Sequence, residues 1–136
     1  MSEKTKKAVA NHHNGYNCAQ SVACAFAEDM GFDEGQVFAL TEALGFGMGC
    51  MSVCGAVSAM SVVAGMNESS GEPGNSSTKK AGYKASKAMH KAFVEKNGSV
   101  ICREIKGMDT GKVLRDCDGC VEDAAEILEK YLGGGF

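Results

Sequence analysis

The longest uncharged stretch of the chain, from Ala43 to Asn67, restricts what the chain can fold into. Its part from Met51 to Met66 is almost entirely small or apolar. A helix over this part would be about 24 Å long, which is short of the ~30 Å hydrocarbon core of a bilayer. No Lys or Arg flanks it, although basic residues usually flank membrane spans. We therefore expect a buried central helix and no membrane insertion.

Apolar residues recur mostly at helical spacing, and no segment alternates strictly in the way of a half-buried strand. The length of 136 residues, with 44% hydrophobic and 23% charged residues, suits one compact domain. We predict an all-α fold, a single-domain helical bundle over residues 1–136 with about five to six helices. The glycine-rich turn from Gly45 to Gly49 precedes its buried central helix.

Capping and stop residues set the expected limits of the helices. Asn17 and Gln20 have the spacing of a capping box at the start of the second helix, and Gly31 is its expected end. The helices are expected over about residues 3–12, 17–30, 33–44, 52–66, 77–96 and 118–132, with a short helical turn at 99–105. The polar segment from Asn67 to Asn75, which holds the only Pro, is expected to be a surface loop.

The charge balance bears on possible partners. With 14 basic against 17 acidic residues, the chain lacks the broad positive field that binds a phosphate backbone, so we do not expect a nucleic-acid partner. The start MSEKTKKAVA has no apolar core of a secretory signal, and we expect a cytoplasmic protein. A lysine face on the helix at 77–96 is interpreted as solvated, with an acidic partner as the alternative. Its members are Lys80, Lys84, Lys87 and Lys91. The small residues of the central helix would also suit packing against a second copy, so a homodimer is a further expectation.

The seven cysteines need an explanation of their own. In a reducing cytosol a domain of this size does not need disulfides, and an odd number of thiols cannot all pair within one chain. Five of them fall in or next to the first turn of a predicted helix: Cys18, Cys54, Cys102, Cys117 and Cys120. Helix N-termini favour the thiolate, the form that binds metals or attacks disulfides. If these helix starts converge, they form a thiolate site. Cys24 faces away from Cys18 on its helix and is predicted to be a packing residue.

The spacing of the cysteines narrows the chemistry. Cys117 and Cys120 form a CxxC pair, and Cys50 and Cys54 form a CxxxC pair. A zinc ribbon needs a second CxxC, and covalent haem attachment needs a His directly after Cys120; both are absent. No βαβ pattern precedes the CxxC, which disfavours a thioredoxin-like fold. An iron–sulfur cluster, a zinc site and a dithiol that cycles with a disulfide remain open.

Other polar residues near these motifs carry less information. Asp116 and Asp118 flank Cys117 and are expected to disfavour a low-pKa nucleophile there while tolerating a bound cation. His12, His13 and His90 are interpreted as surface residues, and no Cys–His catalytic pair is predicted. The turn from Gly45 to Gly49 lacks the GxGxxG spacing of a dinucleotide site. Its expected role is to bring Cys50 and Cys54 toward the other cysteines.

Several of these motifs together resemble a known family. They are the segment GYNCAQS from Gly15 to Ser21, the glycine-rich turn, CGAV from Cys54 to Val57, Cys102-Arg103, and Cys117 ten residues before Ile127. The chain is similar, from about Asn14 to Leu132, to the redox-active proteins with the cysteine signature C_GCAxxG_C_C. The resemblance implies a small helical redox protein whose functional set is Cys18, Cys54, Cys102 and Cys117. Cys50 and Cys120 are additions to that set.

The same family resembles part of the split-Soret cytochromes, which carry an iron–sulfur centre besides haem, and only the cluster carries over by analogy. Our leading hypothesis is electron transfer with a redox partner protein, through an iron–sulfur or related metal centre. The expected ligands are Cys18, Cys54, Cys102 and Cys117, with Cys50 and Cys120 as alternates. One alternative is a thiol–disulfide oxidoreductase that uses Cys50/Cys54 or Cys117/Cys120. Another is a helical module with a structural zinc held by four thiolates.

Overall fold

Seven α-helices and three short helical turns make up the regular structure. The computed structural model describes residues 1–136. The helices are α1 (Glu3–His13), α2 (Cys18–Ala27), α3 (Glu34–Thr41), α4 (Gly55–Glu68), α5 (Lys79–Asn97), α6 (Cys102–Ile105) and α7 (Cys117–Leu132). The turns are η1 (Glu28–Met30), η2 (Glu42–Leu44) and η3 (Gly47–Met51). The predicted all-α class is confirmed, and the helix count exceeds the expected one because the turn around Cys102 is a short helix in its own right.

Local capping places the helix limits close to those predicted. The Gln20 amide N–H donates to Asn17 Oδ1 at 2.9 Å, and the Asn17 N–H donates to Gln20 Oε1 at 3.0 Å. This is the predicted capping box at the start of α2. Gly31, with φ of 85°, ends the α2–η1 segment in the left-handed conformation.

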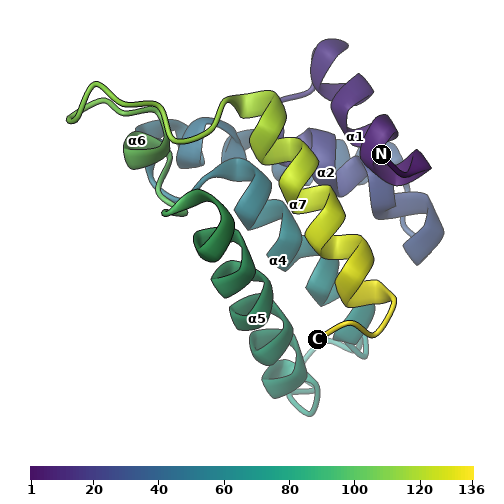
Figure 1. Cartoon of the computed structure of the whole chain (residues 1–136). Helices are drawn as coiled ribbons and strands as arrows, with labels where there is room; N and C mark the ends of the chain where they lie inside the picture. Colours follow the sequence, from purple (N-terminus) through teal and green to yellow (C-terminus); the bar gives the residue numbers. More distant parts are fainter.

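The helix formed by the uncharged stretch, α4, lies in the middle of the bundle, as predicted. It packs against α2, α5 and α7, which run beside it in Figure 1, and α1 covers α2 and α7. Ala56, Ala59, Met60 and Val63 of α4 are buried, and the small ones let neighbouring backbones approach closely. None of the helices combines the length and the apolarity that crossing a bilayer requires.

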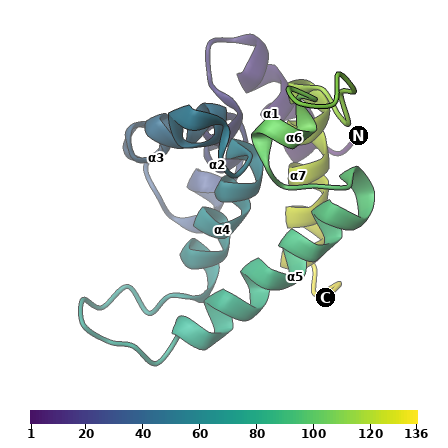
Figure 2. The ribbon, with the colours of Figure 1, turned by 90° about the vertical axis from the view of Figure 1, so that its left-hand side faces the viewer.

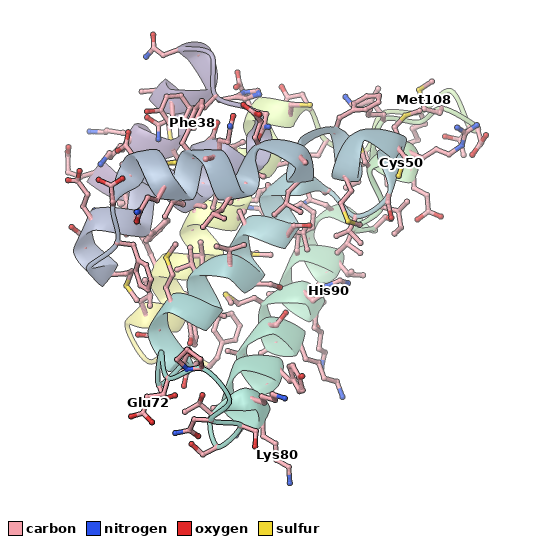
Figure 3. The ribbon with its side chains drawn as sticks, turned by 180° about the vertical axis from the view of Figure 1, so that it is seen from behind. Phe38, Cys50, Glu72, Lys80, His90 and Met108 are labelled. Atoms are coloured by element: carbon pink, nitrogen blue, oxygen red, sulfur yellow. The ribbon has the colours of Figure 1, made fainter.

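Helix α5 forms one side of the molecule and follows the long polar loop after α4 (Figure 2). The four lysines of the predicted face are exposed along it, as a solvated face requires. Figure 3 shows Lys80 and Glu72 at one end of the molecule and Cys50 with Met108 at the other. The start of α5, where Lys80 lies, is therefore at the opposite end of the molecule from Cys50.

The start of α4 differs from the prediction by three residues. Val53 pairs with the segment before α6 through an isolated antiparallel bridge to Ile101. The Cys54 N–H donates to the Val100 carbonyl and the Cys102 N–H to the Ser52 carbonyl, both at 2.7 Å. The backbone hydrogen bonds of this pair replace those of a helix, so the helix begins only at Gly55.

Candidate functional site

The first turns of four helices meet at one end of the bundle. Between them lies a cavity of about 180 Å³, called the thiol pocket below. Its lining includes five cysteines, Cys18, Cys54, Cys102, Cys117 and Cys120, together with His12, Phe46, Lys106 and Arg115. All five cysteines placed at helix starts from the sequence are thus brought together.

Each of these cysteines has a defined place at its helix start. Cys18, Cys102 and Cys117 are the first residues of α2, α6 and α7, and Cys54 is the N-cap of α4. Cys120 lies one turn further along α7. Cys54, Cys102 and Cys120 are buried and Cys18 is half-buried, whereas Cys117 is exposed. The pocket therefore reaches the surface on the side of Cys117.

The other two cysteines lie outside the pocket. Cys24 is fully buried in the middle of α2, where its thiol donates to the Glu34 carbonyl at 3.8 Å. Burial, followed by the nearby Glu34 carboxylate, raises the pKa of Cys24 to about 11. Cys50 is exposed in η3, and its thiol donates to the Gly47 carbonyl at 3.5 Å. Figure 3 shows Cys50 and Met108 at the end of the molecule opposite Glu72 and Lys80.

Two glycines let the walls of the pocket approach each other. A Cβ on Gly55 would lie 2.7 Å from Cys18 Sγ, so only glycine fits where α4 starts against α2. Gly47 has φ of 57°, and a Cβ there would lie 2.4 Å from the Ser52 nitrogen. Phe46 and Met48 also have positive φ, an uncommon conformation for residues with side chains. The tight turn before α4 is therefore held in a strained conformation beside the cysteines.

The pKa values of Cys54 and Cys120 are shifted in opposite directions. Hydrogen bonding from the Cys120 side chain lowers the pKa of Cys54, and the Ala56 and Val57 N–H groups and the Lys106 charge act in the same direction against burial. The same hydrogen bond and burial raise the pKa of Cys120 well above its usual range. The pocket thus favours a thiolate on Cys54 and a protonated thiol on Cys120.

The remaining buried thiols compete with Cys54 for negative charge. Burial raises the pKa of Cys18, and the charge of Cys54 adds to the effect. Burial also raises the pKa of Cys102, where the Lys106 charge opposes the shift. Several thiolates can coexist here only if positive charge is supplied.

Positive groups line the pocket, and the sequence interpretation missed them. Lys106 Nζ lies 3.5 Å from Cys117 Sγ and 5.8 Å from the centre of the Phe46 ring. The Arg115 guanidinium donates to the buried Asp123 carboxylate, with Nε 3.1 Å from Oδ2. Lys106 follows Cys102 by four residues, which places both on one face of a helix. From the sequence alone, this four-residue spacing was the one sign that Lys106 lies beside Cys102.

The two acids that flank Cys117 are occupied by other groups. Asp116 is the N-cap of α7 and accepts the Gly119 N–H at 2.7 Å. Asp118 accepts from the side chains of His12 and His13, at 2.5 and 2.7 Å, and these interactions lower its pKa. The interpretation of His12 as a plain surface residue is wrong, because its ring is half-buried and lines the pocket. The expectation that these acids disfavour a low-pKa nucleophile at Cys117 stays a prediction.

The cysteines surround the cavity without meeting at one point. No three or more of the Cys, His, Asp and Glu side chains are grouped closely enough to hold a single metal ion. All seven cysteines are free thiols. The site is therefore an open pocket with sulfur atoms distributed around its walls.

The fold and this pocket define a class: small helical proteins with a cluster of free cysteines at converging helix N-termini. Within it, the chain belongs to the family described as "Putative redox-active protein (C_GCAxxG_C_C)", whose model matches residues 16–131. The resemblance stated from the motifs is confirmed, and the protein is a redox-active protein of this family. No match is found among curated proteins or among solved structures.

Proposed function

We propose that the protein transfers electrons through an iron–sulfur cluster held in the thiol pocket by Cys18, Cys54, Cys102 and Cys117, with Cys120 as an alternate ligand. The observation that carries this proposal is the convergence of four helix N-termini, each bearing a cysteine, on one cavity of about 180 Å³. Helix N-termini favour thiolates, the form that binds iron.

The spread of the sulfur atoms favours a cluster over a structural zinc. A zinc site needs four ligands at about 2.3 Å from one ion. The cysteines here do not approach one point in that way. In a cluster with several irons, different cysteines bind different irons, so the sulfurs stay further apart and the inorganic core fills the space between them.

The surroundings of the pocket also suit a cluster. When bound, a cluster supplies one-electron transfer, and its potential depends on nearby charge and on solvent exposure. Cys54 and Cys102 are buried, so most of the site is shielded from water. Cys117 is exposed, which gives a redox partner protein one route of approach. We place this exchange in the cytoplasm, where the thiols stay reduced.

A second candidate, a dithiol that exchanges with a disulfide, is favoured by the arrangement of the CxxC. Cys117 is exposed at the start of α7 near Lys106, whereas Cys120 is buried and protonated. The Cys117 thiolate would attack a partner disulfide and release one thiolate. The thiolate released from the partner would then take the proton of Cys120, and the Cys120 sulfur would displace the second partner sulfur, which leaves Cys117–Cys120 oxidised and the partner reduced. The alternative pair Cys50/Cys54 is less favoured, because Cys50 does not line the pocket.

Anaerobic purification followed by visible absorption and analysis of iron, zinc and sulfide tests the leading proposal. We expect iron and sulfide in similar amounts with a broad visible absorption. Protein that stays colourless after reconstitution with iron and sulfide would refute the cluster. Zinc without colour would favour the structural site.

Two matched serine variants separate the cluster from the dithiol. Cys102→Ser should lower the iron content, with Cys120 left as the alternate ligand, and should leave metal-free protein able to form the Cys117–Cys120 disulfide. Cys120→Ser should abolish that disulfide but leave a cluster on the other four cysteines. Counting thiols and iron in both variants distinguishes the two functions.

A further inference from the structure

The positive groups that line the thiol pocket differ in their partners. Arg115 is paired with Asp123 and Glu122, and His12 with Asp118. Lys106 has no carboxylate within ion-pair distance, although it lines the same cavity. Its ammonium group instead lies 3.5 Å from Cys117 Sγ. Lys106 is therefore the one pocket cation whose charge is not already balanced by an acid.

The position of Lys106 is fixed from two sides. It is the C-cap of α6, which begins at Cys102, and its N–H donates to the Cys102 carbonyl at 2.9 Å. The Phe46 ring lies 5.8 Å from Nζ, at a distance suited to a cation–π contact. The single turn of α6 thus carries a sulfur ligand at one end and a free positive charge at the other.

Besides Cys117, the cysteines Cys18 and Cys102 line the same cavity as Lys106. The Lys106 ammonium group therefore lies in a cavity whose walls carry several sulfur atoms. A fixed charge at this distance in a partly buried site interacts strongly with any change in the charge of the pocket.

We propose that Lys106 is the charge-compensating residue of the thiol pocket and that its ammonium group raises the reduction potential of the site. The proposal builds on the proposed function. One electron that enters a cluster from an external reductant makes the site one charge more negative, and Lys106 stabilises that product. For the dithiol, two electrons and two protons convert the disulfide into two thiols, and Lys106 stabilises the thiolate formed when one of them ionises. The direction of the effect is the same in both cases.

The test is the midpoint potential of Lys106→Met, which keeps an unbranched side chain one atom shorter and removes the charge. Lys106→Arg keeps the charge, and Lys112→Met removes an exposed lysine outside the pocket. The titration of the as-purified protein with dithionite follows the cluster absorption, or the thiol count if no cluster is present. We expect the equilibrium constant for reduction to be about tenfold smaller in Lys106→Met. The midpoint potential should therefore be lower by about 59 mV for a one-electron site or about 30 mV for a two-electron site. Lys106→Arg and Lys112→Met should stay close to the wild type.

A second readout does not depend on the bound group. In metal-free, reduced protein, the rate of alkylation of Cys117 by iodoacetamide should fall about tenfold in Lys106→Met. Cys50 is exposed and outside the pocket, so its rate in the same sample, resolved by peptide mass spectrometry, serves as the internal control. An unchanged potential in Lys106→Met overturns the proposal. If the protein shows neither cluster nor reversible disulfide, the proposed function fails, and the Cys117 rate alone then decides whether Lys106 acts on the sulfur.

Discussion

Two buried cysteines of the same bundle differ in chemistry because they occupy different regions of their helices. Cys24 lies in the middle of α2, where the backbone N–H groups already serve the helix, and its pKa is raised to about 11 by burial. Cys54 lies at the start of α4, where Cys120 and free backbone N–H groups lower its pKa in spite of burial. The contrast shows that burial alone does not set the pKa of a thiol in this bundle, because the Cys120 hydrogen bond and the free N–H groups at the start of α4 outweigh burial at Cys54, whereas burial prevails at Cys24.

The largest expected difference between the two regions is chemical. Cys54→Ser should lose more than about nine-tenths of the bound iron or of the redox activity. The reason is that a serine hydroxyl binds soft metals poorly and cannot form a thiolate. Cys24→Ala should keep both and lose about 1 kcal/mol of unfolding free energy from its core position. Iron content and urea denaturation measure the two effects. Equal loss of iron in both variants would remove the distinction between the regions.

The next effect concerns the close approach at the start of α4. Gly55→Ala would place a methyl group 2.7 Å from Cys18 Sγ and 2.9 Å from the Leu44 carbonyl oxygen. We expect a loss of about 1–3 kcal/mol by overpacking, together with weaker cluster retention. Gly65→Ala, later in the same helix, meets no atom within 4 Å and should gain about 0.5–1 kcal/mol. Thermal denaturation of both variants gives the comparison, and a stabilised Gly55→Ala would contradict it.

The pH dependence of the unfolding free energy tests whether Cys24 is held as a neutral thiol in the folded protein. Its pKa is higher in the folded than in the unfolded chain, so folding holds its proton more tightly. The stability contributed by the neutral thiol is complete below the ordinary cysteine value and is lost as the pH rises from 9 to about 11. Urea denaturation across this range should show a steeper decline in the wild type than in Cys24→Ala, by about 1–2 kcal/mol at the upper end. Parallel curves would show that Cys24 does not titrate in this way.

The smallest effect is expected from the exposed lysines at the other end of the molecule. Lys80→Gln and Lys87→Gln should change the stability by less than about 0.5 kcal/mol and leave the midpoint potential unchanged. Salt screens charges over about 10 Å, so these side chains act only weakly on the pocket. If the midpoint potential of Lys80→Gln or Lys87→Gln shifted as much as that of Lys106→Met, the potential would depend on the net charge of the protein and not on the contact between Lys106 and Cys117.

The parts of the fold that the sequence predicted are those set by neighbours in the chain. The capping box of Asn17 and Gln20, the stop at Gly31 and the uncharged core helix all rest on local spacing. The cysteine positions at helix starts were predicted for the same reason. The positive φ values of Phe46 and Met48 were not predictable, because such residues adopt this conformation only when the surrounding structure imposes it.

The parts of the site that the sequence did not predict depend on contacts between distant segments. His12 lines the pocket because Asp118 of α7 binds it, and Arg115 is held there by Asp123. The uncharged, small and apolar composition predicts that Ser52 and Val53 belong to the following helix. In the structure Val53 pairs with Ile101 instead. Each of these contacts needs the tertiary arrangement to be known first.

The short backbone pairing before α4 and α6 sets which positions beside Cys54 and Cys102 can change without moving the two sulfur atoms. The spacing between Cys54 and Cys102 depends on two main-chain hydrogen bonds, donated by the cysteines' own N–H groups. The side chains of Ser52, Val53 and Ile101 are only half-buried. Mutational drift at these three positions should therefore be tolerated as long as the backbone stays extended, and the sulfur atoms keep their separation while the residues around them change.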